Sequence, residues 1–366
     1  MSTDATLKAG TNGHGPSHAG PPPNPHLWSR DGFNGDICVT SRPYPIIDYT
    51  DVRGPHAPHR LDLTRVGPID RTDPEALPTP IAQSRKDVVV SVSARSEPTP
   101  FLLRNAESDE MHFIQEGEID YVTDFGTLHA APGDFVHLPR AVTYRVVPTQ
   151  SPTLRVIVEA PGQMLLKPPA PFGMINLARD VRRADPAQGS AMDGPVQLVV
   201  KCYDGITRFT LPRDPMALNA VIGGEIPVWK VNLAAIQPLT YLPHGGPPDS
   251  FAETDDRDLL FYTLSARTGN RPPMHHNADY DELIFYFRGP GHYGQLTQPG
   301  QLAWTPKSLA HWGPEEDVPD GYLAWLLESS GTIRLTPAGA AAAELMETGE
   351  FGLADTVALS EREVRA

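Results

Sequence analysis

The chain has 366 residues, 40 of them proline, and carries 30 basic against 45 acidic side chains, for a formal net charge of −15. This charge opposes contact with phosphate backbones, and no stretch approaches the roughly 18 consecutive apolar residues of a membrane span. Nucleic acid and membrane are therefore not expected partners, and we expect a cytoplasmic protein. The length suffices for two domains with separate cores, while the many prolines disfavour long helices.

The first half of the chain is predicted to contain a tail, an arm and one β-barrel. Residues 1–25 are rich in Gly, Pro, Ser and His, a composition typical of a disordered tail. Residues 26–165 are expected to form an irregular arm and a first barrel, because runs such as Val88–Ser93 and Thr153–Glu159 are rich in β-branched residues. Residues 166–215 indicate a linker.

The second half is predicted to contain another barrel over residues 216–337. Residues 338–366 are expected to form a short helix and a tail, since an alanine-rich run opens this segment. The two cysteines, Cys38 and Cys202, are far apart and lack metal-type spacing, so we expect ordinary buried thiols rather than a disulfide.

Two imidazoles and a carboxylate in the predicted second barrel have metal-ligand order. His276 and Glu282 are six residues apart, and an even separation on a strand points both side chains to one face. The strand-like run Leu283–Phe287 follows, and a second run, Gln301–Thr305, precedes His311 and could lie beside the first. The spacing therefore predicts a metal site formed by His276, Glu282 and His311.

The type of these ligands indicates which metal they would hold. Two His and one carboxylate leave adjacent coordination positions open, the arrangement of non-haem Fe(II) oxygenases. Fe(II) is therefore the expected cofactor. His275 neighbours a predicted ligand and would tend to face away on a strand, so an outer role is favoured over ligation, although it stays open as a fourth ligand.

The same spacing of Glu, Pro and Gly residues occurs earlier in the chain, but most of the predicted metal ligands are missing there. Glu110 precedes Gly117 by seven residues, as Glu282 precedes Gly289, and the intervals from Pro132 to Tyr144 match those from Pro299 to His311. Arg104–Ala106 stands near the place of His276, and Tyr144 replaces His311. The first copy is therefore predicted to be metal-free.

This double pattern resembles the cupin motif pair, and among bicupins the chain most resembles the homogentisate 1,2-dioxygenase family. The resemblance covers roughly residues 26–335 and rests on several segments: Arg271-Pro-Pro before His276 and Glu282, Arg288-Gly289, Gly291-His292-Tyr293, His311 with Gly313-Pro314-Glu315, Trp229–Leu233, and Tyr121–Phe135. It implies an all-β bicupin of two jelly-roll barrels, with an irregular N-terminal arm and a short C-terminal helix.

The chain also departs from the family pattern. Val221–Glu225 lacks the His that the family carries shortly before its Tyr-Lys-Tyr-Asn-Leu segment, Pro290 and Gly291 look inserted, and Trp312 separates His311 from Gly313. The chain is also shorter than typical family members. The missing base leaves His275, His292 and His244 as alternative proton acceptors.

The resemblance implies oxidative cleavage of a hydroquinone-type ring by Fe(II) and O2, with homogentisate or a related aromatic acid as substrate. His292 and Tyr293 are then expected to position or protonate the oxygenated intermediate, and Arg288 to orient the substrate's acid group. Trimers that pair into hexamers are the implied assembly. Three alternatives stay open: a gentisate-like or other substituted phenol as substrate, a non-oxygenase cupin such as an isomerase or decarboxylase, and a binding protein without catalysis.

Overall fold

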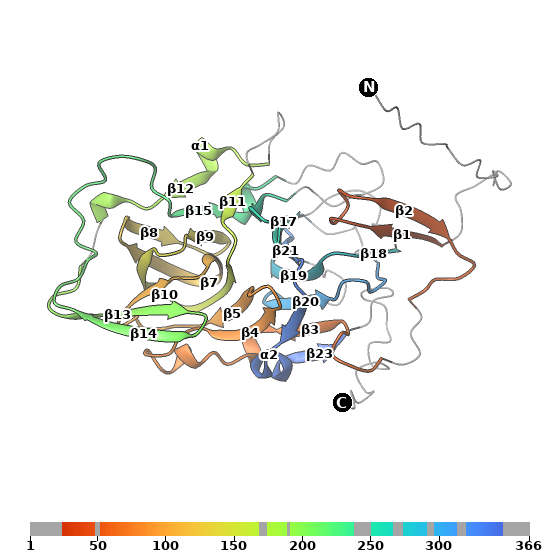
Figure 1. The fold of residues 1–366 in the computed structure, drawn as a ribbon, viewed down its shortest axis with the longest axis horizontal. Coiled ribbons are helices and arrows are strands. Elements are labelled where there is room, and N and C mark those ends of the chain that lie inside the picture. The colour runs from red at the N-terminus through yellow and green to blue at the C-terminus, as the bar shows by residue number, and fades with distance from the viewer. Residues whose placement is uncertain are drawn as a thin grey trace, which may run out of the picture.

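The computed structural model describes residues 24–47, 52–167, 174–188, 191–237, 250–265, 274–290, 296–312 and 320–346. Strands dominate this part of the chain, and its α-helices are limited to α1 (Leu177–Asp180) and α2 (Pro337–Ala341) (Figure 1). The all-β prediction is confirmed. Within the same residues, no helix is long and apolar enough to cross a membrane.

Two large sheets repeat one strand order. The central path of the first sheet is β12 (Val181–Arg183), β15 (Trp229–Asn232), β9 (Asp134–Leu138), β7 (Asp109–Thr123), β10 (Thr143–Ala160), β5 (Val89–Ser93), β4 (Thr79–Ser84) and β22 (Ile333–Leu335). The second sheet, in matching order, is β23 (Ala343–Leu345), β3 (His59–Asp62), β20 (Gln301–Thr305), β19 (Asp281–Arg288), β21 (Leu323–Ser329), β17 (Leu259–Ser265), β16 (Ala252–Thr254) and β11 (Met164–Leu166). The duplication inferred from sequence intervals therefore extends to the whole strand order.

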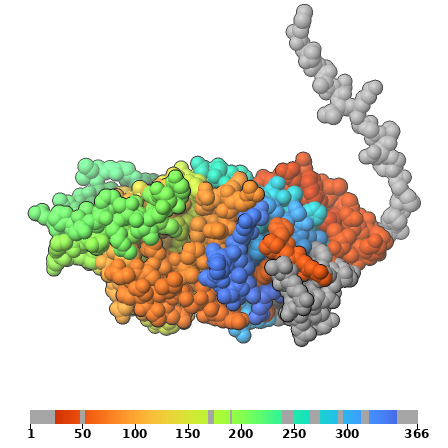
Figure 2. All heavy atoms as spheres, turned by 60° about the horizontal axis from the view of Figure 1, so that its bottom comes forward, coloured from red at the N-terminus to blue at the C-terminus, as the bar shows by residue number. Residues whose placement is uncertain are grey.

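Each large sheet and the strands attached to it are called a lobe, the first containing β7 and the second containing β19. A hairpin packs at the end of each lobe in the same way. In the first lobe, β6 (Leu102–Asn105) pairs in parallel with β13 (Val196–Cys202), which continues through a tight turn into β14 (Gly205–Leu211). In the second lobe, β18 (Met274–Asn277) pairs in parallel with β1 (Pro25–Ser29), which is followed by β2 (Ile37–Ser41). Figure 2 shows these hairpins at opposite ends of the molecule, β13–β14 in green and β1–β2 in red. The remaining strand, β8 (Gly126–Ala130), pairs with β7.

The lobes exchange strands and share one core. β3 precedes the first lobe in sequence but joins the second sheet, whereas β15 and β22 join the first sheet. Phe113 of the first lobe packs against Trp325 of the second with ring centroids 5.2 Å apart, and Trp325 stacks on Phe285 at 3.8 Å. Because buried aromatic rings from both lobes meet here, each lobe completes the core of the other.

Matching glycines occupy equivalent positions of the long central strands, Gly117 inside β7 and Gly289 directly after β19. Gly117 and Gly289 have φ values of +78° and +114°, a region that side-chain-bearing residues rarely adopt. A Cβ would lie 2.4 Å from the Pro152 carbonyl oxygen in the first case and 2.3 Å from that of Gly321 in the second. Both conformation and close backbone approach therefore require glycine, which explains why the sequence interval is preserved in both copies.

Several expectations differ from the structure. The predicted linker at 166–215 contains β12 and the β13–β14 hairpin, because β13 completes the first sheet beside β6. The alanine-rich run forms a helix for only five residues and then becomes β23, since pairing with β3 overrides helix propensity. Cys38 is exposed on β2 and Cys202 is half-buried, so neither is a buried thiol. The predicted tail lies almost wholly outside the described residues.

Candidate metal centre

Three buried side chains of the second lobe converge on one point. His275 lies on β18 and Glu282 on β19, while His311 is joined to His275 by two backbone hydrogen bonds of 2.9 and 2.8 Å. The exposed fractions of the three residues are 4%, 8% and 4%. One nitrogen or oxygen atom from each lies within 4.8 Å of the other two. Within the described residues this is the group whose geometry suits a metal ion.

The tautomer of His311 is set by its backbone contact. Its Nδ1 lies 3.0 Å from the Leu309 carbonyl oxygen, which can only accept, so Nδ1 carries the proton. In the neutral imidazole Nε2 is then the nitrogen free to bind a metal, and it faces Glu282 with 3.5 Å between Nε2 and Oε2. Two donors held about 2.1 Å from one ion at about 90–110° are separated by about 3.0–3.4 Å. The His311 and Glu282 atoms therefore fit a common ion with little adjustment.

Charge and burial act against each other in this cluster. Burial by itself raises the pKa of Glu282, but the nearby His311 and His275 and a hydrogen bond from Asn277 bring it below its ordinary value. Burial lowers the pKa of His311, yet the Glu282 carboxylate outweighs it and raises that pKa. The site thus favours an ionised carboxylate beside a positive charge, which a bound cation also supplies.

The position of His276 corrects the ligand set predicted from sequence. Its Nδ1 lies 3.0 Å from Nε2 of His26 on β1, and the two rings are 4.8 Å apart, so it faces the N-terminal hairpin rather than Glu282. The parity argument assumed one continuous strand from 276 to 282. Instead, Asn277 Oδ1 accepts hydrogen bonds from the backbone N–H groups of Asp279 and Tyr280, which turns the chain between β18 and β19. The turn brings His275 into the cluster.

The remaining residues predicted for the site have different outcomes. Arg288 is exposed at the far end of β19, six residues beyond Glu282 and thus roughly 20 Å along the strand, with its guanidinium 5.1 Å from the Phe287 ring centroid. The structure does not bring Arg288 together with the cluster. His292, Tyr293 and His244 lie outside the described residues.

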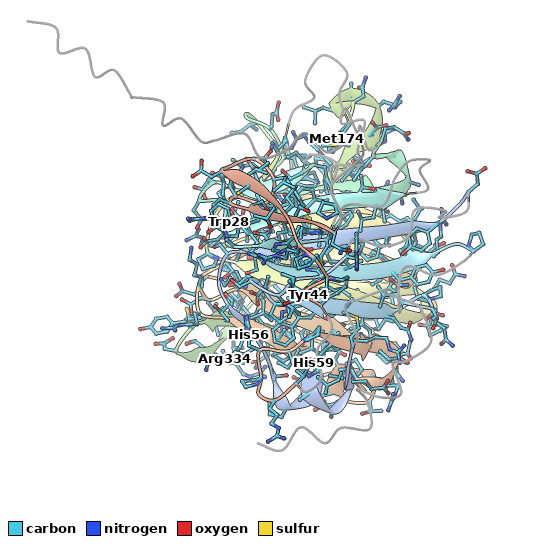
Figure 3. All side chains as sticks on the ribbon, turned by 90° about the vertical axis from the view of Figure 1, so that its right-hand side faces the viewer. Trp28, Tyr44, His56, His59, Met174 and Arg334 are labelled. Atoms are coloured by element: carbon cyan, nitrogen blue, oxygen red, sulfur yellow. The ribbon has the colours of Figure 1, made fainter. Side chains whose placement is uncertain are left out.

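The N-terminal hairpin covers one side of the cluster. The ring of Phe33 lies 5.1 Å from that of His275, and β1 pairs with β18 so that Trp28 stands opposite His276. Figure 3 looks onto this end of the molecule, with Trp28 on β1. Ion pairs between Arg30 and Asp279 and between Arg257 and Asp31 attach the turn of the hairpin to the second lobe. The arm is therefore part of the wall of the site.

A second layer of polar residues lies behind Glu282. The Asn277 amide donates to Glu328 Oε1 at 3.2 Å, and Tyr262 donates to Glu328 Oε2 at 2.8 Å. Burial and the charge of Glu282 raise the pKa of Glu328 to about 8. Sequence reasoning missed Asn277 and Glu328. A signal was available, because Asn105 and Glu110 repeat the five-residue spacing of Asn277 and Glu282.

The corresponding positions of the first lobe hold different chemistry. Strand pairing places Leu103 opposite Tyr144, as His275 stands opposite His311. Glu110 is retained, but Tyr144 donates to its Oε2 at 2.6 Å and His112 Nε2 lies 2.9 Å from the same oxygen. The carboxylate is therefore surrounded by hydrogen-bond partners where the second lobe has two imidazoles.

Comparison with known proteins supports the resemblance noted in the sequence. No family model matches the chain. A homogentisate 1,2-dioxygenase from Bradyrhizobium diazoefficiens is 28% identical over 232 residues, which is 58% of this chain and 51% of that protein. One from Rhodopseudomonas palustris is 26% identical over 274 residues, covering 66% and 60%. The chain is similar in sequence to homogentisate 1,2-dioxygenases. It spans only about half to three fifths of the length of these relatives.

Solved structures similar to the chain include cupins. A cupin 2 conserved barrel domain protein from Leptotrichia buccalis has 12% identity and a TM-score of 0.38, with 76% of this chain and 96% of that chain covered. A variant of Bacillus subtilis oxalate decarboxylase has 10% identity and a TM-score of 0.40, with coverages of 78% and 80%.

Proposed function

We propose that the chain is an Fe(II)-dependent dioxygenase that cleaves the ring of homogentisate or a related hydroquinone-type aromatic acid with O2. The observation that carries the proposal is the buried convergence of His275, Glu282 and His311. Two imidazoles and one carboxylate suit Fe(II) and leave positions for two further ligands. The similarity to proteins named homogentisate 1,2-dioxygenase supports this choice of chemistry.

In this proposal His275, Glu282 and His311 would hold Fe(II), which would supply Lewis-acid and O2-activating chemistry. The chain's residues prepare the site for it. His311 is held in its metal-binding tautomer by the Leu309 carbonyl, and Glu282 contributes the negative charge. Phe33 and the paired β1 and β18 backbones shield His275 from water. His292 and Tyr293 stay predicted as proton-transfer and substrate residues.

The test is reconstitution of the metal-free protein with Fe(II) under anaerobic conditions, followed by O2 uptake against homogentisate, gentisate and simple hydroquinones. We expect O2 consumption with at least one of them and a loss of uptake in Glu282→Ala. An Fe(II)-loaded protein inert to the whole panel would refute ring cleavage. Turnover of a substrate without O2, or with Zn(II) in place of Fe(II), would assign the site to non-oxygenase chemistry.

A further inference from the structure

A hydrogen-bond frame built on one asparagine occurs in each lobe, beside the buried carboxylate of the central strand, Glu110 on β7 and Glu282 on β19. In the first lobe, Asn105 Nδ2 donates to Glu110 Oε1 at 2.9 Å and to Glu159 Oε2 at 2.7 Å. The Asn105 Oδ1 accepts from the backbone N–H groups of residues 107 and 108 at 3.1 and 3.0 Å. One asparagine therefore ties two buried carboxylates to the turn that follows β6.

The second lobe repeats much of this frame. Asn277 Oδ1 accepts from the N–H groups of residues 279 and 280 at 3.1 and 3.2 Å, and its amide donates to Glu328 Oε1 at 3.2 Å. The same side chain also helps to lower the pKa of Glu282. Glu282 and Glu328 face each other across β19 and β21, as Glu110 and Glu159 do across β7 and β10. The frame belongs to the duplicated scaffold.

The two copies differ in what else engages the carboxylates. In the first lobe, Lys201 of β13 contacts both oxygens of Glu159 at 2.6 Å. Strand register places Lys201 beside Asn105, and it places Ser29 of β1 beside Asn277 in the same way. Ser29 is fully buried, and its hydroxyl finds no partner among the described residues. The second lobe thus retains the frame without its lysine.

We propose that Asn277 and Glu328 are positioning residues for the metal centre, which hold the Glu282 carboxylate in the orientation that binds the ion. The proposal rests on the proposed metal site and deepens it. Both N–H groups that bond Asn277 Oδ1 belong to backbone, so the direction of its amide is determined by the turn. Glu328 accepts one amide proton at 3.2 Å, and Asn277 also favours the ionised form of Glu282, which pairs with Glu328 across the strands. Losing an outer partner of a metal ligand typically lowers metal affinity about 10–100-fold.

The experiment is titration of the full-length, metal-free protein with Co(II) under anaerobic conditions, followed by its visible absorption. We expect Asn277→Ala and Glu328→Ala to raise the Kd for Co(II) at least tenfold and to shift the absorption bands. Glu328→Gln retains an oxygen that can accept from Asn277, so it should stay within about threefold of wild type. Thermal unfolding of each metal-free variant tests whether it is folded.

The first lobe provides the matched control. Asn105→Ala breaks the same frame around Glu110, so it should lower the thermal stability while leaving the Co(II) Kd and spectrum unchanged. A folded Asn277→Ala that binds Co(II) within threefold of wild type, with an unchanged spectrum, overturns the positioning role. If Glu328→Gln loses as much affinity as Glu328→Ala, the hydrogen-bond argument is wrong. Wild-type protein that binds no Co(II) refutes the metal site itself, which is a distinct result.

Discussion

The choice between two adjacent histidines is the sharpest consequence of the structure. His275 lies in the buried cluster with Glu282 and His311, whereas His276 contacts His26. His275→Ala removes a direct ligand, so its effect should exceed the roughly 100-fold upper range for outer partners. That factor corresponds to about 2.7 kcal/mol of metal-binding free energy. The variant should still fold, since the strand pairing of β18 uses backbone atoms, but loss of a buried ring packed against Phe33 should lower its stability.

His276→Ala should give the opposite pattern. It removes one hydrogen bond of 3.0 Å, whose net contribution to the free energy of unfolding is about 0.5–1.5 kcal/mol, or a few degrees of Tm at most. Metal affinity should stay within about fivefold of wild type. Equilibrium titration with Fe(II) or Co(II), paired with calorimetric unfolding of each metal-free variant, measures both quantities. If His276→Ala abolishes binding while His275→Ala retains it, the assignment made from the structure is wrong.

Three further outcomes follow from charge and backbone geometry. Ser29→Lys places an ammonium where the first lobe has Lys201, so repulsion of the ion should weaken Co(II) binding, and an unchanged Kd would contradict the match between lobes. Burial raises the pKa of Asp109, but hydrogen bonds from an imidazole and two backbone N–H groups outweigh it and lower that pKa. The stabilisation is therefore present above the unfolded pKa of about 3.9 and is lost as pH falls through the folded pKa. Asp109→Asn should therefore destabilise at pH 7, and its difference from wild type in chemical denaturation should shrink as the pH falls below about 3.9. Gly289→Ala should lower Tm more than Gly54→Ala, because both glycines have positive φ but only a Cβ on residue 289 would meet a backbone oxygen. Equal losses of Tm would mean that backbone strain, and not the close contact, destabilises both variants.

Much of the fold was predictable because local patterns were strong. The runs Leu283–Phe287 and Gln301–Thr305 predicted neighbouring strands, and β19 and β20 pair antiparallel over these residues. The interval from Glu to Gly is repeated because each central strand needs a glycine at the point where the backbone of another segment approaches. Strand content and internal duplication could therefore be inferred without coordinates.

The identity of one predicted ligand could not be inferred in the same way. Counting alternate residues from Glu282 selects His276, and only the turn at Asn277 shows that the count is interrupted. The helix expected after residue 337 forms but ends at Ala341 for a related reason, since β23 pairs with β3 from the start of the chain. In the first case a side-chain contact of Asn277 interrupted the expected strand, and in the second a distant strand pairing outweighed local helix propensity.

The sequence by itself determined the all-β class and the repeated residue spacing. It also determined that the candidate metal ligands, histidines and a glutamate, lie in the second half of the chain. Those features depend on spacing and side-chain chemistry, which are local. Tertiary structure alone decided that His275 joins Glu282, that the N-terminal hairpin walls the site, and that Asn277 and Glu328 stand behind it. These relations depend on strand register between segments up to about 250 residues apart, and no local pattern encodes which of these distant strands will pair.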